Sequence, residues 1–378
     1  MKRALPALAA LSVLFASLAH SAVPVPQPPQ LNARGYLLVD HVSGKVIAER
    51  NADERLEPAS ITKLMTAYAV FHALHDGKLK LGEGVSISPK AWKAEGSRTF
   101  VQVGTQVPVE VLIQGMIVQS GNDATIALAE RVGGNEETFA SLMNGYAKQL
   151  GMKSSNFENS TGLPGPQHYT TARDIAILAR AIIREFPQYY RWYSQHDFTW
   201  NNIKQSNRNG LLYRDPSVDG MKSGHTESAG YCLVTSAKRD DMRLVSVVLG
   251  TPSIRAREDA SQALINYGFS FYETKKVYSA GRKLGATKVW KAEDSPADVG
   301  IRNDLYVTVP RGQAAKLRGT VTLTPNLIAP VASATAVGEL QVLLEDTVIA
   351  RRPLHPLQNV ERGGLWRRAL DSVWLWFE

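Results

Sequence analysis

The spacing of apolar residues changes several times along the chain, and each change predicts a different kind of structure. Apolar runs at 36–40 and 45–49 flank the turn-forming segment His41-Val-Ser-Gly44, which predicts a β-hairpin. From Ser60 to Leu74, apolar residues recur three and four positions apart, as they do along one face of a helix. The same spacing predicts four more helices, over residues 109–118, 124–132, 136–150 and 172–186.

Strand-like sequence returns in the second half of the chain. Runs rich in β-branched residues at 231–236 and 244–249 flank a polar turn, and an amphipathic segment at 256–271 predicts a closing helix. A hairpin, a helical cluster, more strands and a final helix predict an α/β (α+β) fold. One sheet, assembled from both ends of this region, is covered by helices. We therefore assign residues 31–275 to a single domain.

After residue 276 the helical spacing disappears. Valine and threonine alternate in Tyr306-Val-Thr-Val-Pro310 and in Gly319-Thr-Val-Thr-Leu-Thr324, and proline and glycine recur at short intervals. This pattern predicts a small all-β domain over residues 276–358.

Residues 1–22 have the three-part layout of a secretory signal peptide. Lys2 and Arg3 form a basic start, the run from Leu5 to Leu18 is almost wholly apolar, and small residues close the segment. An uncleaved signal anchor is the alternative, but the apolar run is short for a membrane span. The Pro-rich residues 23–30 then predict an extended tether. Together these segments predict a secreted, periplasmic protein.

The last segment, residues 361–378, predicts an amphipathic helix that lies on the outer face of the inner membrane. Gly363 and Gly364 form a joint, and most apolar residues from Leu365 onward fall on one half of a helix. Three of the seven tryptophans lie in this tail, and tryptophan favours membrane interfaces. The segment is too short to cross a hydrocarbon core of about 30 Å. The alternative is a helix packed on its own β domain.

Composition and charge narrow the classes of function. The formal net charge of +8 falls to +6 once Lys2 and Arg3 leave with the signal peptide, and no dense stripe of Lys and Arg occurs, so no nucleic-acid partner is expected. The one cysteine, Cys232, excludes an intrachain disulfide and any Cys-x-x-Cys metal site. His72 and His75 have no third ligand nearby in the sequence, so neither a metal nor a cofactor is expected.

Three short motifs carry the candidate chemistry. Ser60-Ile-Thr-Lys63 stands where a loop enters a helix, Ser120-Gly-Asn122 stands in a turn between two helices, and Lys222-Ser-Gly224 opens a strand. Each motif alone is common, because serine is a favoured helix cap and Ser-Gly-Asn is ordinary turn sequence. All three, in this order and at these places in the fold, predict a catalytic site.

The residue types in these motifs suit acyl transfer. Residues three apart on a helix share one face, so Lys63 can reach Ser60 and serve as the base that a serine nucleophile needs. Backbone N–H groups at a helix start stabilise a developing oxyanion. Ser120 offers a hydroxyl for proton transfer, Asn122 an amide that can hold a peptide group, and Lys222 a positive charge for a carboxylate. The motifs therefore predict acyl transfer on a peptide with a free carboxylate end.

On these motifs the chain resembles the low-molecular-mass penicillin-binding proteins, the D-alanyl-D-alanine carboxypeptidases of the type-5/type-6 group. The likeness covers nearly the whole chain and includes Ser120-Gly-Asn-Asp123, Asn207-Arg-Asn-Gly-Leu211, the segment 218–226, the β domain and the aromatic tail. Two departures occur. Lys222-Ser-Gly224 replaces the usual Lys-Thr-Gly, and a loop position near Thr161 lacks a histidine that some members carry.

The resemblance implies a fold, an activity and residue roles. The fold is a β-lactamase/transpeptidase-like antiparallel sheet covered by helices. The activity is removal of the terminal D-alanine from peptidoglycan stem pentapeptides, and β-lactam antibiotics bind covalently at the same serine. Ser60 is the implied nucleophile, Lys63 the general base and Ser120 the proton relay. The implied substrate contacts are Asn122, Lys222, Ser223, Gly224 and His225. The backbone N–H groups of Ser60 and His225 are the implied oxyanion hole. Arg208 and Arg257 are implied as supporting charges or structural ion pairs.

Three other functions use similar motifs. A class A β-lactamase would carry Glu-x-x-x-Asn between the second and third motifs, and residues 151–219 contain no such pattern. A β-lactam sensor without catalysis would need transmembrane helices and a signalling domain, which the sequence does not predict. A D,D-endopeptidase needs the same residues as a carboxypeptidase and remains open as an alternative.

Overall fold

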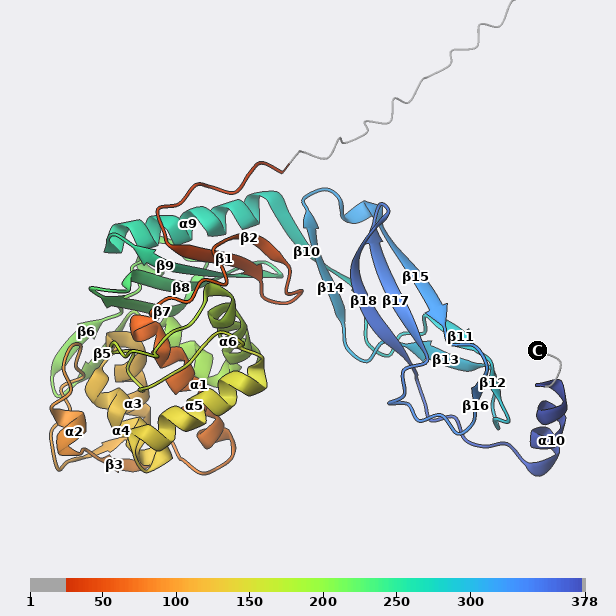
Figure 1. Cartoon of the computed structure of the whole chain (residues 1–378), viewed down its shortest axis with the longest axis horizontal. Coiled ribbons are helices and arrows are strands. Elements are labelled where there is room, and N and C mark those ends of the chain that lie inside the picture. Colours follow the sequence, from red (N-terminus) through yellow and green to blue (C-terminus); the bar gives the residue numbers. More distant parts are fainter. Residues whose placement is uncertain (1–24, 376–378) are drawn as a thin grey trace, which may run out of the picture.

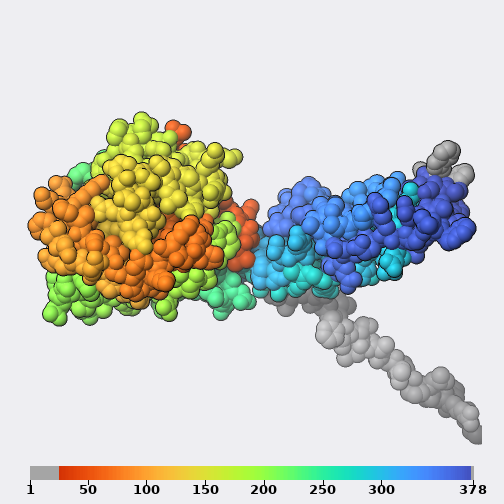
Figure 2. Space-filling view, turned by 90° about the horizontal axis from the view of Figure 1, so that it is seen from below, coloured from red at the N-terminus to blue at the C-terminus, as the bar shows by residue number. Residues whose placement is uncertain are grey.

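The structure is a computed structural model, and it describes residues 25–375. The predicted signal peptide at 1–22 and the last three residues of the predicted tail lie outside the described residues. Figures 1 and 2 show an elongated molecule in which a large N-terminal domain and a smaller β domain meet at a narrow junction.

A five-stranded antiparallel sheet organises the N-terminal domain. The strand order is β2-β1-β9-β8-β7, so the first hairpin of the chain pairs with strands from the far end of the domain (Figure 1). This confirms the prediction of one sheet built from both ends of the region. The strands are β1 (Gly35–Asp40), β2 (Val46–Arg50), β7 (Val218–Thr226), β8 (Gly230–Arg239) and β9 (Met242–Thr251).

Both faces of this sheet are covered. Leu37 and Val39 of β1 pack into the helical cluster on one face, whereas Leu38 packs toward helix α9 (Ile254–Phe271) on the other. The alternation arises because successive side chains of a strand point to opposite faces. Burying such a side chain contributes about 1.5–3 kcal/mol, so the apolar runs of the central strands stabilise both layers.

The helical cluster forms between β2 and β7. Helix α1 (Lys63–His75) crosses the centre of the cluster, and eleven of its thirteen residues are buried, which fixes the position of the motif at its start. The other long helices are α4 (Asn122–Gly133), α5 (Glu136–Leu150) and α6 (Ala172–Glu185). The short helices of this region are α2 (Pro89–Trp92), α3 (Val109–Gln114), α7 (Pro187–Tyr190) and α8 (Leu211–Arg214). Two strand pairs complete it: β3 (Gly84–Ser86) with β4 (Gln106–Pro108), and β5 (Asp197–Trp200) with β6 (Ile203–Ser206).

The second domain is all-β, as its sequence predicts. Strand β10 (Tyr272–Tyr278) pairs with β14 (Leu305–Pro310), and a five-stranded sheet has the order β11-β13-β18-β17-β15. A core of valines and leucines fills the domain. Its remaining strands are β11 (Gly285–Thr287), β12 (Val289–Trp290), β13 (Ala297–Gly300), β15 (Leu317–Leu323), β16 (Leu327–Ile328), β17 (Gly338–Leu344) and β18 (Thr347–Pro356).

A buried polar network joins the two domains. The carboxylate of Asp40, at the end of β1, accepts hydrogen bonds from the Ser43 hydroxyl at 2.8 Å and from the Thr274 hydroxyl of β10 at 2.8 Å. The hydroxyl of Thr308 on β14 lies 2.6 Å from that of Ser43 and 2.8 Å from that of Thr274. The β domain is therefore bonded directly to the turn of the first hairpin.

Several predicted boundaries differ from the structure. Helix α4 starts two residues earlier than expected, and the β domain starts with β10 at Tyr272 rather than at residue 276. The tail helix α10 spans Leu365–Trp374 and starts four residues later than expected, because residues 361–363 pair with the β domain: the carbonyl of Glu361 accepts from the Glu293 N–H, and the Gly363 N–H donates to Lys291. Residues 25–30 are extended, but they are bonded to α9, since the Tyr267 hydroxyl donates to the Pro26 carbonyl at 2.8 Å.

Candidate active site

The first motif forms a tight turn at the start of α1. Residues Ala59–Thr62 make one 3-10 turn, and Ala59 adopts a positive φ of 46° to enter it. A Cβ atom on Gly162 would lie 1.8 Å from the Ala59 carbonyl oxygen, and one on Gly224 would lie 3.1 Å from the backbone nitrogen of Ser60. Two glycines thus allow a loop and a strand to press against the turn that presents Ser60.

Lys63 is buried directly behind Ser60. Its Nζ atom lies 3.0 Å from the Ser60 Oγ atom, 2.7 Å from the Asn122 Oδ1 atom and 2.7 Å from the Thr161 carbonyl oxygen. Burial, reinforced by the Arg208 cation, lowers the pKa of Lys63 to about 7. Near neutral pH this side chain therefore exists in both protonation states, as a general base requires.

The second motif stands at an irregular helix end. Helix α3 continues into a π-helical turn, Gly115–Gln119, and Ser120 ends it with a left-handed backbone, φ 66°. Ser120 is buried at the edge of the cleft. The Asn122 side chain donates from Nδ2 to the Glu95 carbonyl at 2.6 Å, and its Oδ1 atom accepts from Lys63. The next residue, Asp123, accepts from the backbone N–H groups of Thr99 and Phe100, both at 2.8 Å. That carboxylate holds one wall of the cleft in place.

The third motif lies inside strand β7 and does not open it, because β7 begins at Val218. Ser223 and His225 line the cleft, and the His225 ring stacks on Tyr231 with 4.0 Å between centroids. Lys222 differs from its predicted position: it lies below the cleft floor, 2% exposed, with Nζ donating to the Ser223 carbonyl. The reason is that neighbouring side chains on a strand point in opposite directions.

Two arginines complete the wall around Ser223. Arg257 donates to the Gly224 carbonyl at 3.2 Å and to the Arg208 carbonyl at 3.4 Å, while the Arg208 Nε atom donates to Gln119 at 3.0 Å. Both bind backbone carbonyls, and within residues 25–375 neither forms a salt bridge, so the predicted ion pairs are wrong. Burial and the cations Lys63, Arg208 and Arg257 hold the pKa of Lys222 well below its ordinary value.

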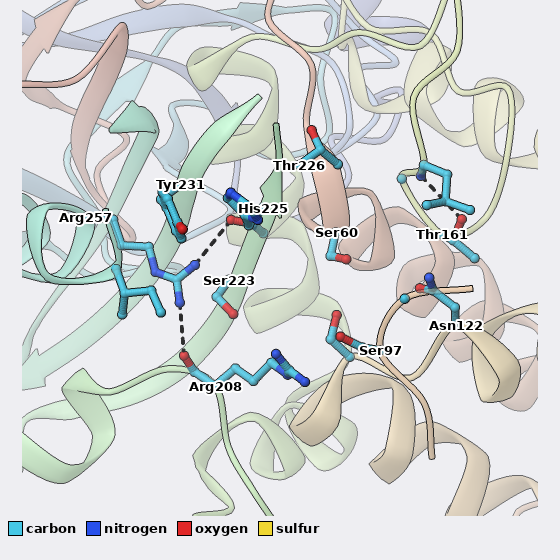
Figure 3. A pocket seen from close by; sticks show the side chains of 16 residues that line it. Ser60, Ser97, Asn122, Thr161, Arg208, Ser223, His225, Thr226, Tyr231 and Arg257 are labelled. Carbon is cyan, nitrogen blue, oxygen red and sulfur yellow. Dashed lines mark hydrogen bonds between the residues drawn. The ribbon is translucent and has the colours of Figure 1, made fainter. Parts of the chain in front are cut away.

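The three motifs surround one cleft of about 650 Å³. Figure 3 shows Ser60 in its centre, with Ser223 and the two arginines to one side and Ser97 and Asn122 to the other. Every residue predicted for the site lies in this cleft or directly beneath it. The arrangement combines a serine beside a buried amine, backbone N–H groups at a tight turn and a cationic wall, which suits acyl transfer from a substrate that carries a carboxylate.

Sequence analysis missed a supporting loop under the nucleophile. Residues 159–168 reach the first motif: the Thr161 carbonyl binds Lys63, and buried His168 lies 2.8 Å from the Thr62 hydroxyl. Glu136, at the start of α5, binds both the N–H and the hydroxyl of Ser160. No spacing rule connects these residues, although the breaker Gly162-Leu-Pro-Gly-Pro166 marks the loop.

This fold and site define a serine acyl-transferring enzyme of the penicillin-binding type. The chain belongs to the D-alanyl-D-alanine carboxypeptidase family: residues 22–253 match that family, and residues 272–362 match the C-terminal domain of penicillin-binding protein 5. These matches confirm the predicted family and the predicted class of serine-type carboxypeptidase.

Individual relatives support the same family assignment. The chain is 43% identical to the D-alanyl-D-alanine carboxypeptidase DacC of Escherichia coli K12 over 99% of its own length and 96% of the relative. It is 39% identical to DacA of the same strain over 100% and 96% of the two chains. The crystal structure of penicillin binding protein 5 from Haemophilus influenzae superposes with a TM-score of 0.86 at 41% identity, over 89% of this chain and 100% of that one.

Proposed function

We propose that this carboxypeptidase removes the terminal D-alanine from peptidoglycan stem pentapeptides through an acyl-enzyme on Ser60. The observation that carries this proposal is the buried Lys63 amine, 3.0 Å from the Ser60 hydroxyl, beside a cleft with a cationic wall. Stem pentapeptides are peptides with a free carboxylate end, which is the substrate class this cleft suits.

Acylation begins when the Ser60 Oγ atom attacks the carbonyl carbon of the D-Ala–D-Ala bond and passes its proton to neutral Lys63. The backbone N–H groups of Ser60 and His225 stabilise the oxyanion. Both can reach it because Gly224 has no side chain, so β7 lies close to the turn that carries Ser60. Collapse of the tetrahedral intermediate breaks the peptide bond. The Ser120 hydroxyl relays a proton to the departing amine of D-alanine.

The terminal carboxylate is held by the cleft wall around Ser223. We assign its direct contacts to the Ser223 hydroxyl and to Arg208 and Arg257, because these groups line the cleft. Asn122 orients the peptide amide. Lys222 acts from beneath by donating to the Ser223 carbonyl, since its amine does not reach the surface of the cleft.

Hydrolysis of the acyl-enzyme completes the cycle. Water adds to the ester carbonyl, its proton passes to the Lys63 amine, and the Ser60 oxygen leaves with a proton from Lys63. A β-lactam enters the same cycle at the first step, because its ring amide acylates Ser60 and its carboxylate meets the same wall. The test of this function is release of D-alanine from a stem pentapeptide, compared with a cross-linked dimer that only an endopeptidase cleaves.

The tail helix α10 attaches the protein to a membrane surface. Leu365, Trp366, Leu370, Val373 and Trp374 are each 60% exposed or more, so one face of α10 is apolar and open. The opposite face is bonded to the β domain: Arg367 donates to the Glu293 carbonyl, and Asp371 accepts from the Lys291 N–H. Figure 1 supports this role, because α10 lies at the end of the β domain farthest from the N-terminal domain.

Attachment by α10 is peripheral. Within residues 25–375, no helix is long and apolar enough to cross a bilayer. An amphipathic helix instead lies in the interface with its apolar face buried, and tryptophan side chains favour that depth. Together with the signal peptide predicted at 1–22, peripheral attachment supports a location in the periplasm, on the outer face of the inner membrane, where peptidoglycan is within reach.

A further inference from the structure

A second carboxylate stands behind the base, outside the three motifs. Glu136 is the first residue of α5, and its side chain is buried although it is charged. One oxygen accepts from the Ser160 hydroxyl at 2.6 Å and from the Ser160 N–H at 3.1 Å. The other lies 2.9 Å from the amine of Lys90, which is half exposed. Burying a carboxylate costs desolvation free energy, which its three partners offset only in part. We therefore asked what the position of Glu136 contributes to the site.

Glu136 fixes the loop that supplies an acceptor to Lys63. Ser160 is held from two sides, because its carbonyl also accepts from the Thr66 hydroxyl of α1 at 2.6 Å. The very next residue, Thr161, turns its carbonyl to the Lys63 amine at 2.7 Å. The aim of that carbonyl therefore depends on how Ser160 is held.

That carbonyl decides where the lone pair of neutral Lys63 points. A neutral amine has two N–H bonds and one lone pair. The Asn122 oxygen and the Thr161 carbonyl, each 2.7 Å away, take the two N–H bonds, so the lone pair is left facing the Ser60 hydroxyl. If the Thr161 carbonyl moved, an N–H bond could turn toward Ser60 and the amine could no longer accept its proton.

The charge of Glu136 also reaches Lys63. The titratable and charged groups that act on the Lys63 amine are Asp123 of α4, Glu136 of α5, Lys222 of β7 and Arg208 of the loop before α8, with Lys90 behind Glu136. Asp123 and Glu136 raise the pKa of Lys63, while burial and Arg208 lower it. Asp123 is already committed to the backbone of the cleft wall, so Glu136 is the carboxylate whose charge can be altered with least damage.

We propose that Glu136 is a positioning residue for the base: through Ser160 it aims the Thr161 carbonyl at Lys63, and its charge favours the protonated form of Lys63. This rests on the proposed role of Lys63 as general base. Lys90 weakens the effect of the Glu136 charge on Lys63, because its own positive charge lies 2.9 Å from the Glu136 carboxylate.

The test measures the rate constant of Ser60 acylation by a fluorescent penicillin from pH 5 to pH 10. The variants are Glu136→Gln, Glu136→Ala and Lys90→Met, and Glu345→Gln, an exposed carboxylate of the β domain that pairs with Lys316, is the matched control. Glu136→Gln keeps an acceptor for Ser160 but loses the charge, so the acid limb moves to lower pH by about half to one unit. Lys90→Met moves it to higher pH, and Glu345→Gln leaves it in place.

Glu136→Ala removes the acceptor as well as the charge, so acylation falls about tenfold or more at every pH, and Gln at this position restores most of the rate at high pH. A merely structural role would lower rates without moving the limb in opposite directions. Profiles of Glu136→Gln and Lys90→Met that superpose on wild type overturn the proposal. Failure of the proposed function would appear separately, as a wild-type enzyme that releases no D-alanine from pentapeptide.

Discussion

The Nζ atom of Lys63 lies 3.0 Å from the Oγ atom of Ser60, and the Lys63 side chain is buried. Because α1 is buried along nearly its whole length, this distance is held by the core and not by a mobile loop. The same burial that fixes the pair also lowers the pKa of Lys63 to about 7. Position and basicity therefore have one physical origin.

Replacing Lys63 should abolish acylation and not merely weaken binding. Loss of a general base costs about 10²–10⁴ in rate, so Lys63→Ala should react with penicillin at least a hundredfold more slowly. Lys63→Arg is the matched control, because it keeps the positive charge but does not lose a proton near neutral pH. In wild type, the acylation rate should rise with pH through about 7 as Lys63 loses its proton. A Lys63→Ala enzyme with near-normal rates would refute the base role.

Arg208 should recognise the substrate carboxylate. A hydrogen bond to a charged group is worth about 1.5–3 kcal/mol, so Arg208→Gln should raise KM for a stem pentapeptide about ten- to a hundredfold. Steady-state kinetics on the pentapeptide and on its C-terminal amide provide the comparison. The amide lacks the charge, so its turnover should change little in the variant. An equal loss on both substrates would mean that Arg208 only supports the cleft wall.

Removal of α10 should detach the enzyme from membranes without affecting catalysis. The cut belongs after Gly364, because residues 361–363 pair with the β domain and their loss would disturb it. Flotation with anionic vesicles should show the full-length mature chain in the lipid fraction and the shortened chain in the soluble fraction. Both should release D-alanine from a soluble peptide at equal rates. A double substitution, Trp366→Ser with Trp374→Ser, should reproduce the detachment.

Persistent vesicle binding by the shortened chain would place the anchor elsewhere. Detachment together with lost activity would make α10 a structural part of the enzyme.

His168 should make the fold sensitive to acid. The Glu158 N–H donates to its Nδ1 atom, so the proton sits on Nε2 and points to the Thr62 hydroxyl, and burial lowers the pKa of His168 to about 4. The unfolded chain therefore binds more protons between pH 6.5 and 4, and stability falls as pH drops through that window, by at most about 3 kcal/mol.

Urea denaturation at pH 7 and pH 5 measures this effect. The loss of unfolding free energy between the two should be smaller in His168→Gln than in wild type, whereas the exposed His75→Gln should match wild type. Half-buried His41, whose pKa burial also lowers to about 4, leaves a residual pH dependence in both variants. Identical losses in all three proteins would show that His168 does not titrate on unfolding.

Much of the fold could be predicted because local sequence patterns specify its helices and strands. The helix over 136–150 matches α5 residue for residue, since Asn135 caps it and Gly151 ends it in a left-handed conformation. The apolar runs of β8 and β9 are buried on both faces, so they stand out in any sequence. The contact between Ser60 and Lys63 follows from their three-residue spacing at a helix start, and only the three motifs together predict that the pair is catalytic.

The rest depended on contacts between distant segments. Whether Lys222 lies on the cleft floor or beneath it is decided by the register of β7 against β8, which no local pattern specifies. The supporting roles of Glu136 and His168 arise because α5 and the loop at 159–168 pack behind α1, far from both in sequence. The late start of α10 reflects pairing of residues 361–363 with the β domain.

The most direct test of the central claim is D-alanine release from a peptidoglycan stem pentapeptide by the wild-type enzyme and by Ser60→Ala. The account predicts release by the wild type in step with appearance of the tetrapeptide, and none by Ser60→Ala, in which the rest of the cleft is preserved. Release by Ser60→Ala at a rate near that of the wild type, or no release by the wild type, would contradict it.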